Sequence, residues 1–311
     1  MNITPTSEAE FGAIVTDVRL AELTSTEFEE LHHAFLLYGF LIFPEQFLTT
    51  EQNIEFGERF GELEFGGLPI ANQKLNSDGT WGHIYRLDSR RMRTNVGNEA
   101  WHTDSTYLPV SSKCALLSAV KVPSSGGETE LADARAGYAA LGSALKARVE
   151  QLSAYHSTQY SQANDLGDFT ENTPDSIYHG EAYLRPLVKR HPETGKKNLF
   201  VGRHAFGIPG LSRDESRALL ASLVETIVSA PARVYQHQWQ AGDTLLWDNR
   251  ALLHRAKPYD YNEPRVMTAT RVQGDVASEL AYYPEDPQAA EGRIALANEL
   301  EWLKQKNLAD H

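Results

Sequence analysis

The feature that most constrains the fold is a set of three candidate metal ligands that lie far apart in the sequence. His102 and Asp104 are two residues apart, and such residues project from the same face of a strand. His254 lies in an apolar, strand-like run 150 residues after Asp104. One site assembled from both halves of the chain argues against two independent folding units. We therefore expect a single domain over residues 1–311, with a C-terminal helical extension over about 285–311.

Two histidines and one carboxylate on one face of a metal leave its opposite face open, which is typical of non-heme Fe(II) oxygenases. An isolated His-x-Asp pair is weak evidence, because a hydrogen-bonded pair at a strand end explains it equally well. Two other residues favour the metal site. Arg265 lies eleven positions after His254 and has the two-pronged guanidinium that binds a carboxylate. Thr129, 27 positions after His102, offers a hydroxyl group to the same anion.

Motifs along most of the chain resemble the taurine and aryloxyacetate dioxygenase family of Fe(II)/2-oxoglutarate enzymes. The resemblance runs from about residue 10 to residue 275 and includes YGFLIF (38–43), FGEL (60–63), WHTD (101–104), PSSGGET (123–129), RHPETGK (190–196) and WDNR (247–250). Residues 117–120 and 133–138 are similar to the aryloxyacetate branch in particular. The resemblance implies that His102, Asp104 and His254 bind iron. It also implies that Thr129 and Arg265 hold the distal carboxylate of 2-oxoglutarate.

Short apolar runs bounded by turn residues predict a mainly β fold with flanking helices. We expect strands over residues 40–43, 115–122, 199–202, 234–239, 244–247 and 266–272. We expect helices over residues 24–38, 51–60, 212–228 and 290–307, and two helical turns or a short helix pair within 134–152. Short strands with helices outside fit a double-stranded β-helix, or jelly roll, better than alternating βαβ units. The family resemblance implies the same fold. The last helix could pack on its own domain or on a neighbouring subunit.

Composition narrows the class of protein. A hydrophobic share of 41% suffices for a core, and no apolar stretch approaches the roughly 20 residues that cross a bilayer. The formal charge of -13 disfavours nucleic acid, whose affinity depends on cationic contacts with phosphate. The N-terminal residues lack the basic and apolar segments of a secretory signal, which predicts a cytoplasmic protein. We expect a small-molecule substrate, no nucleic-acid or membrane partner, and a homo-oligomer. Cys114, the only cysteine, excludes an internal disulfide and has the apolar neighbours of a buried thiol.

The predicted function is an Fe(II)- and 2-oxoglutarate-dependent dioxygenase that uses O2 to hydroxylate a small organic substrate and releases succinate and CO2. The substrate is cleaved where hydroxylation creates a hemiacetal or hemiaminal, which collapses. Asp104 counts against halogenation, because related halogenating enzymes have a small residue at this position. Two alternatives stay open: desaturation or ring closure with the same cofactors, and a non-catalytic jelly-roll binding protein with a structural metal. The cosubstrate clamp counts against the binding protein.

Two departures from the family pattern bear on the substrate. The position four after the cosubstrate arginine commonly carries another arginine and is Ala269 here, and a lysine of the aryloxyacetate enzymes falls near Ile70. Loss of both charges predicts that simple aryloxyacetates and taurine are poor substrates, and that the substrate is a larger molecule with a different polar anchor. The candidate substrate contacts are Asn72, Gln73, Asn98, Tyr107 and His204.

A basic cluster lies in a glycine-containing segment before the first ligand. It is interpreted either as a solvated loop, which we favour, or as a mobile lid that attracts an anionic substrate. Its members are Arg86, Arg90, Arg91 and Arg93.

Overall fold

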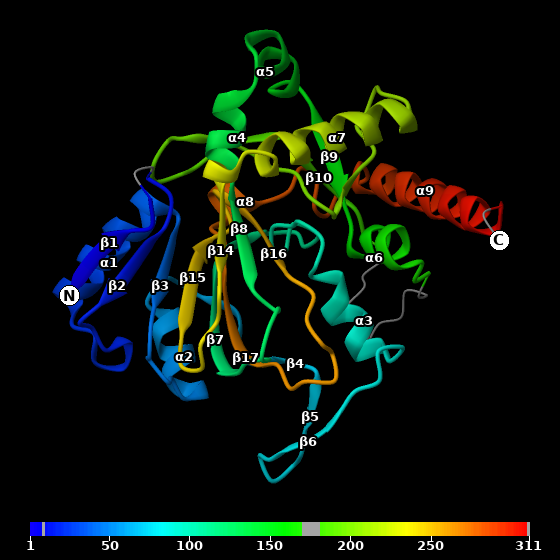
Figure 1. The fold of residues 1–311 in the computed structure, drawn as a ribbon. Helices are drawn as coiled ribbons and strands as arrows, with labels where there is room; N and C mark the ends of the chain where they lie inside the picture. The colour runs from blue at the N-terminus through cyan, green and yellow to red at the C-terminus, as the bar shows by residue number, and fades with distance from the viewer. Residues whose placement is uncertain (8–9, 170–180, 310–311) are drawn as a thin grey trace.

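Two β-sheets face each other at the centre of the molecule (Figure 1). The structure, a computed structural model, describes residues 1–7, 10–169 and 181–309, so residues 310 and 311 of the expected C-terminal extension lie outside the described part. The larger sheet has the strand order β1 (Asn2–Pro5), β2 (Ala13–Thr16), β3 (Phe40–Phe43), β15 (Thr244–Asp248), β7 (Ser112–Lys121), β17 (Val266–Gln273) and β4 (Leu63–Ala71). The smaller sheet has the order β14 (Val234–His237), β8 (Thr129–Asp133) and β16 (Leu252–Ala256). Strands from the two halves of the sequence therefore alternate from β3 to β4 in the larger sheet and throughout the smaller sheet.

Side chains alternate between the two faces of the larger sheet, as the period of a strand requires. Phe40 of β3 points between the sheets, where it belongs to one buried cluster with Leu131 of β8. The next residue of β3, Leu41, belongs instead to a cluster beneath α1 (Ser25–Tyr38) and α2 (Thr50–Glu58). This arrangement confirms the predicted mainly β fold with flanking helices.

The outer face of the smaller sheet is covered by α7 (Arg213–Val228). Leu223 and Ile227 of α7 are fully buried in one cluster with Leu253 of β16. Next to it lie α4 (Ala134–Ala140) and α5 (Ser143–Val149), which are the short helix pair expected within residues 134–152.

The C-terminal helix α9 (Ala289–Ala309) packs on its own chain. It contacts α6 (Thr158–Leu166) and β10 (Tyr183–Pro186), and its Leu296 and Leu303 are buried there. Of the two arrangements that the sequence left open, the structure therefore shows packing on the same subunit for this face of the helix.

Several elements were not anticipated from the sequence. They include β1, β2, β4, β8, β10 and α6, whose bounds are given above. The others are η1 (Leu20–Glu22), β5 (Gln73–Leu75), β6 (Trp81–Ile84), α3 (Arg90–Gly97), β9 (Ser153–His156), β11 (Val188–Arg190), β12 (Lys197–Leu199), β13 (Ala205–Phe206), η2 (Pro231–Arg233) and α8 (Val276–Glu279). The expected strand over 199–202 is wrong, because β12 ends at Leu199. Gly202 has a φ of 137° and passes so close to His102 that a Cβ atom would lie 3.1 Å from the His102 Cα atom. This segment is therefore a loop that passes directly behind a candidate ligand.

Two expectations from composition can be compared with the structure. Cys114 lies fully buried in β7, and burial raises the pKa of its thiol. Within the described ranges, no helix has the length and apolar character that crossing a membrane requires.

Candidate active site

The three candidate metal ligands meet at β16, an edge strand of the smaller sheet. One nitrogen of His102, one nitrogen of His254 and one carboxylate oxygen of Asp104 all lie within 4.8 Å of one another. His254 is on β16, and His102 forms an isolated antiparallel bridge to it, with N···O distances of 3.0 and 2.8 Å. Asp104 follows in a turn, so the expectation that His102 and Asp104 share a regular strand is wrong. The bridge to His254 and the turn after it bring the side chains together instead.

The hydrogen bonding of these residues fits a divalent cation. Asp104 Oδ2 is buried without a hydrogen-bond partner among the described residues and lies 3.6 Å from His254 Nε2. A buried carboxylate oxygen left in this way is costly unless a cation meets it. The Nδ1 atom of His102 lies 2.7 Å from the carbonyl oxygen of Ala100, which can only accept, so Nε2 of His102 keeps its lone pair.

The charge states of the ligands suit a metal as well. Burial is the main cause that lowers the pKa of His102 and of His254, so both imidazoles are neutral. Burial alone would raise the pKa of Asp104, but Arg271 and the other polar neighbours outweigh this effect and lower it. The site therefore offers two neutral nitrogen ligands and one charged oxygen ligand, the set that suits Fe(II).

Arg265 and Thr129 lie in the same cavity as the three ligands. The Nε and Nη2 atoms of Arg265 donate to the carbonyl oxygen of Gly127 at 3.2 and 3.1 Å, which fixes one edge of the guanidinium. Gly127 has a φ of 71°, and a Cβ atom there would lie 3.1 Å from Arg265 Nε. The glycine pair of the 123–129 motif therefore lets the arginine approach this closely. Thr129 begins β8, and its hydroxyl accepts a hydrogen bond from Trp239 Nε1 at 3.0 Å.

The cavity lies between the two sheets and has a polar and an apolar part. Its polar part includes the three ligands, Thr129 and Arg265. The whole cavity is lined by Phe65, Ile70, Asn98, His102, Asp104, Ala115, Leu116, Leu117, Thr129, Trp247, His254, Arg255, Ala256, Arg265, Ala269, Thr270 and Arg271.

Arg271 was not identified as a candidate from the sequence. Its Nη2 atom donates to Asp104 Oδ1 at 2.6 Å, and its Nη1 atom lies 3.4 Å from Glu64 Oε1. Its Nε atom is buried without a hydrogen-bond partner in the described part of the chain. Regular strand spacing does not identify it, because the pairing of β17 with β4 is irregular on both sides of Arg271. The structure thus places a further guanidinium in the cavity beside the metal ligands, in addition to those of Arg255 and Arg265.

The five candidate substrate contacts take different positions. Asn98 lines the cavity. Asn72 is fully buried and structural, because its Oδ1 accepts the Arg265 backbone N–H at 2.8 Å and its Nδ2 donates to Glu263 O at 2.7 Å. Gln73 is not brought to the cavity, since its amide group bonds the Gly82 carbonyl oxygen.

The rings of Tyr107 and His204 pack against each other next to the candidate metal ligand His102. Their ring centroids are 4.7 Å apart, and the His204 ring lies 6.0 Å from that of His102. The His204 Nδ1 atom is 2.9 Å from the hydroxyl of Ser161. Burial raises the pKa of the Tyr107 phenol, and the nearby Arg271 partly opposes this effect. Both residues therefore contact groups that surround the site, although neither lines the cavity itself.

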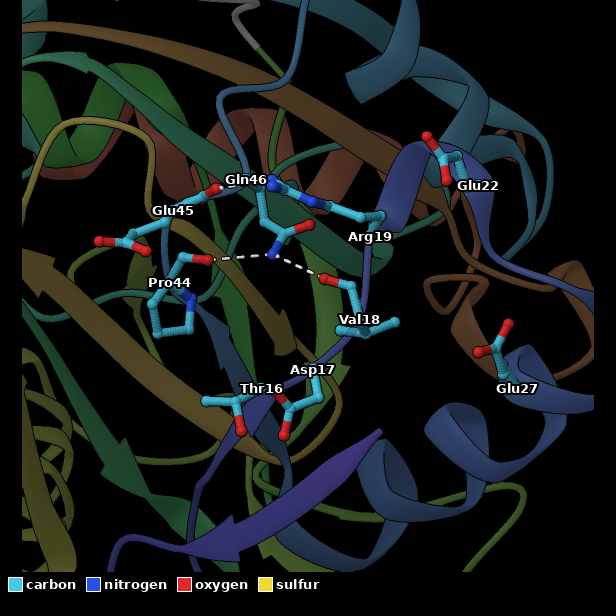
Figure 2. Close-up of a pocket in the computed structure, with 9 residues that line it drawn as sticks. All are labelled: Thr16, Asp17, Val18, Arg19, Glu22, Glu27, Pro44, Glu45 and Gln46. Atoms are coloured by element: carbon cyan, nitrogen blue, oxygen red, sulfur yellow. Dashed lines mark hydrogen bonds between the residues drawn. The ribbon is translucent and has the colours of Figure 1, made fainter.

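The basic cluster and a second pocket lie apart from this cavity. Arg86 is exposed and pairs with Asp88 at 2.7 Å, and Arg91, within α3, donates to the carbonyl oxygen of Pro69. Figure 2 shows a polar pocket near the N-terminal strands, where the amide of Gln46 donates to two backbone carbonyl oxygens. This pocket and the cavity around the ligands have no lining residue in common.

Comparison with known proteins identifies the family. The family model described as "Taurine catabolism dioxygenase TauD, TfdA family" matches residues 2–271. The chain belongs to this family. An (S)-phenoxypropionate/alpha-ketoglutarate-dioxygenase of Sphingobium herbicidovorans is 48% identical over 279 residues, which cover 88% of this chain and 96% of the relative. An alpha-ketoglutarate-dependent 2,4-dichlorophenoxyacetate dioxygenase of Cupriavidus pinatubonensis is 37% identical over 82% of this chain and 92% of the relative.

Solved structures agree with the sequence comparisons. The crystal structure of AAD-2 in complex with Mn(II) and N-oxalylglycine has a TM-score of 0.81 and 35% identity, over 88% of this chain and 98% of that chain. This member of the TauD/TfdA family is thus a jelly-roll dioxygenase that depends on Fe(II), 2-oxoglutarate and O2 and acts on a small organic substrate. The predicted fold, enzyme class and cofactors are confirmed, and the alternative of a non-catalytic binding protein does not hold.

Proposed function

We propose that this enzyme hydroxylates an aryloxyalkanoate, a small aromatic ether that carries a carboxylate, and that Arg271 binds the carboxylate. In this proposal His102, Asp104 and His254 hold Fe(II), while Thr129 and Arg265 bind the distal carboxylate of 2-oxoglutarate. Three guanidinium groups line one cavity with the ligand triad, those of Arg255, Arg265 and Arg271, and Arg255 is paired with Glu130 at 2.6 Å. The observation that carries the proposal is the presence of Arg271 in this cavity in addition to Arg265. The Arg265 guanidinium serves the cosubstrate, whereas Arg271 pairs with Asp104 and keeps a buried Nε–H group, without a partner among the described residues, for a second anion.

Arg271 supplies a positive charge where the sequence analysis found two expected charges missing, at Ala269 and Ile70. Ala269 and Ile70 do lack the charges that related enzymes carry, but Arg271 lines the same cavity and has a buried Nε–H group available to an anion. In place of the larger molecule expected from the sequence, we propose an aryloxyalkanoate whose polar anchor is Arg271. The expectation that simple aryloxyacetates are poor substrates stays a prediction. Phe65, Ile70 and Leu117 supply an apolar part of the cavity that suits an aromatic ring.

The residues of the site have distinct tasks in the proposed reaction. When bound, Fe(II) and 2-oxoglutarate supply the O2-dependent oxidation of a substrate C–H bond to C–OH, with release of succinate and CO2. Arg271 holds the substrate carboxylate next to Asp104, which directs the adjacent carbon toward the metal ligands. Arg265 and Thr129 hold the distal carboxylate of 2-oxoglutarate. The buried cavity excludes water, and its low polarity strengthens both charged contacts.

The hydroxylated aryloxyalkanoate then cleaves without further oxidation. Hydroxylation of the carbon next to the ether oxygen gives a hemiacetal or hemiketal. Its C–O(aryl) bond breaks, the hydroxyl proton passes to the departing phenol oxygen, and a 2-oxo acid remains. Two relatives of this chain, at 48% and 46% identity, have names that specify (S)-phenoxypropionate, which makes this compound the first to test.

The test compares (S)-2-phenoxypropionate with its neutral amide, with phenoxyacetate and with taurine, and measures succinate together with phenol. We expect the acid to be preferred over its amide by roughly tenfold or more, because a charged hydrogen bond contributes about 1.5 to 3 kcal/mol. In Arg271→Gln this preference should disappear, whereas Arg293→Gln on α9 serves as a matched control. Equal turnover of the acid and the amide by the unaltered enzyme would contradict the proposed binding of the substrate carboxylate by Arg271.

The remaining expectations are also proposals. The formal charge of -13 supports an enzyme that acts on free small molecules rather than on nucleic acid. The exposed side chains of Leu280, Tyr282 and Tyr283 support a homo-oligomer. Light scattering of the purified chain would test this, and a monomer at all concentrations would contradict it. The cytoplasmic location and the single-domain organisation stay predictions.

A further inference from the structure

Trp239 holds the hydroxyl of Thr129 in one orientation. The indole N–H can only donate, so Thr129 Oγ1 is the acceptor of the 3.0 Å hydrogen bond between them. A threonine hydroxyl has one hydrogen to donate and two lone pairs. This is the one hydrogen bond that the hydroxyl makes with the described residues. The bond occupies a lone pair and leaves the hydroxyl hydrogen for a group in the cavity.

The indole is itself held rigidly. Trp239 is 8% exposed, and its ring meets that of His237 edge to face at a centroid distance of 4.4 Å. His237 is paired with Thr129 across β14 and β8, and its Nε2 atom lies 3.2 Å from Asp243 Oδ2. The same oxygen of Asp243 accepts the backbone N–H of Gln240 at 3.0 Å, which closes the turn after the tryptophan. The indole N–H therefore has little freedom to leave Thr129.

We propose that Trp239 is a positioning residue for 2-oxoglutarate, which acts by fixing Thr129 as a hydrogen-bond donor toward the distal carboxylate. The inference rests on the proposed role of Thr129 and Arg265 as the cosubstrate clamp. Arg265 supplies the positive charge, and the threonine supplies a directed donor. A hydroxyl that already accepts one hydrogen bond donates a stronger one, because the two bonds polarise each other. The chain of donors runs from the Trp239 indole through Thr129 to the carboxylate.

A double-mutant cycle on 2-oxoglutarate dependence tests this role. The variants are Trp239→Phe, Thr129→Val and the two combined, with Thr129→Ser as the variant that keeps the hydroxyl. Thr129→Val should raise the KM for 2-oxoglutarate roughly tenfold or more, and Trp239→Phe should raise it roughly three- to tenfold. In the Thr129→Val background, Trp239→Phe should add less than twofold, because no hydroxyl remains to be oriented.

Controls separate positioning from loss of structure. Trp302→Phe on α9 removes a tryptophan far from the cavity lining, and far-UV circular dichroism of each variant checks the fold. Replacement of Trp239 by the isosteric benzothienyl-alanine removes only the N–H group and should reproduce the Trp239→Phe effect. The KM for the organic substrate should stay within twofold in every variant.

The possible outcomes are distinguishable. If Thr129→Val leaves the KM for 2-oxoglutarate unchanged, the clamp assignment fails and the inference fails with it. If Thr129→Val acts as expected but Trp239→Phe has no effect, or has the same effect in both backgrounds, the clamp stands and the role of Trp239 is overturned. A strong effect of Trp239→Phe only when Thr129 is present supports the inference.

Discussion

Arg271 donates from Nη2 to Asp104 Oδ1 at 2.6 Å, while the other carboxylate oxygen of Asp104 has no hydrogen-bond partner among the described residues. One carboxylate oxygen is thus committed to a cation on the protein, and the second is left for a metal. Because the same guanidinium lines the cavity, a substrate anion bound to it would sit next to a metal ligand. Arg271 therefore connects the proposed substrate carboxylate directly to Asp104, one of the candidate metal ligands.

Loss of any one ligand should abolish turnover. We expect His102→Ala, Asp104→Ala and His254→Ala each to lower succinate release by more than about 100-fold, because changes to groups that merely support ligands already cost roughly 10- to 100-fold. Titration with Mn(II), followed by electron paramagnetic resonance, should show weakened metal binding. The exposed His33→Ala is the matched control. Coupled turnover near the normal rate in a folded triad variant would exclude that residue as a ligand.

Gly127→Ala should impair cosubstrate binding without touching a charged group. The new Cβ atom would lie 3.1 Å from Arg265 Nε at a φ of 71°, so both the backbone and the guanidinium must shift. We expect the KM for 2-oxoglutarate to rise in the same direction as in Arg265→Ala, where loss of a charged contact should raise it roughly 10- to 100-fold. Gly142→Ala, where a Cβ atom meets no neighbour within 4 Å, should leave it unchanged. An unaltered KM in Gly127→Ala would argue that the close approach is irrelevant to binding.

The sequence predicted the chemistry of the site better than its geometry. His102, Asp104, His254, Thr129 and Arg265 were named from residue type and motif, and the structure gathers all five around one cavity. Arg271 was missed because the expected cation belongs two positions earlier, at Ala269. The pairing of β17 with β4 has register irregularities around Arg271, and local sequence does not reveal such shifts.

Residues assigned from loops were placed least well. Gln73 was grouped with Asn72, yet the two side chains serve different elements, because Asn72 bonds the backbone before β17 and Gln73 bonds within the β5–β6 hairpin. The hairpin has few apolar residues and no strong periodicity, so its residue pattern does not specify its register. Contacts of this kind depend on long-range pairing, which residue patterns do not encode.

The buried Asp248 should make stability depend on pH. Burial would raise the pKa of its carboxyl, but Arg250 and His191 outweigh this and hold the pKa well below its usual range. A depressed folded-state pKa contributes stability that is present above the unfolded-state pKa of about 3.9 and is lost as pH falls toward the folded-state value. We expect Asp248→Asn to lower the free energy of unfolding by about 3 to 5 kcal/mol at pH 7, since it breaks a buried ion pair.

The difference in the free energy of unfolding between Asp248→Asn and the unaltered enzyme should be smaller by about 1 kcal/mol at pH 3 than at pH 7. At pH 3 the carboxyl of Asp248 is already protonated in the unfolded chain. Urea unfolding followed by circular dichroism at both pH values measures it. Asp214→Asn, at the start of α7, is the control. An equal difference in the free energy of unfolding at pH 7 and at pH 3 would contradict a lowered pKa for Asp248.

Ala269 should determine how large a substrate the cavity accepts. Its side chain lines the cavity on the same strand as Arg271. Alanine therefore leaves room beside the proposed anchor. Ala269→Leu would fill that room, and overpacking of this kind costs about 1 to 3 kcal/mol.

We expect Ala269→Leu to raise the KM for (S)-2-phenoxypropionate at least about fivefold, and to raise it further for ring-chlorinated analogues, because a larger ring needs the same space. The KM for 2-oxoglutarate should stay within twofold, since Thr129 and Arg265 are untouched. Ala277→Leu, at an exposed position of α8, controls for added bulk outside the cavity. Equal effects on small and large rings would show that the aromatic group does not lie over Ala269 and would direct attention to Ile70 and Leu117, which line the cavity as well.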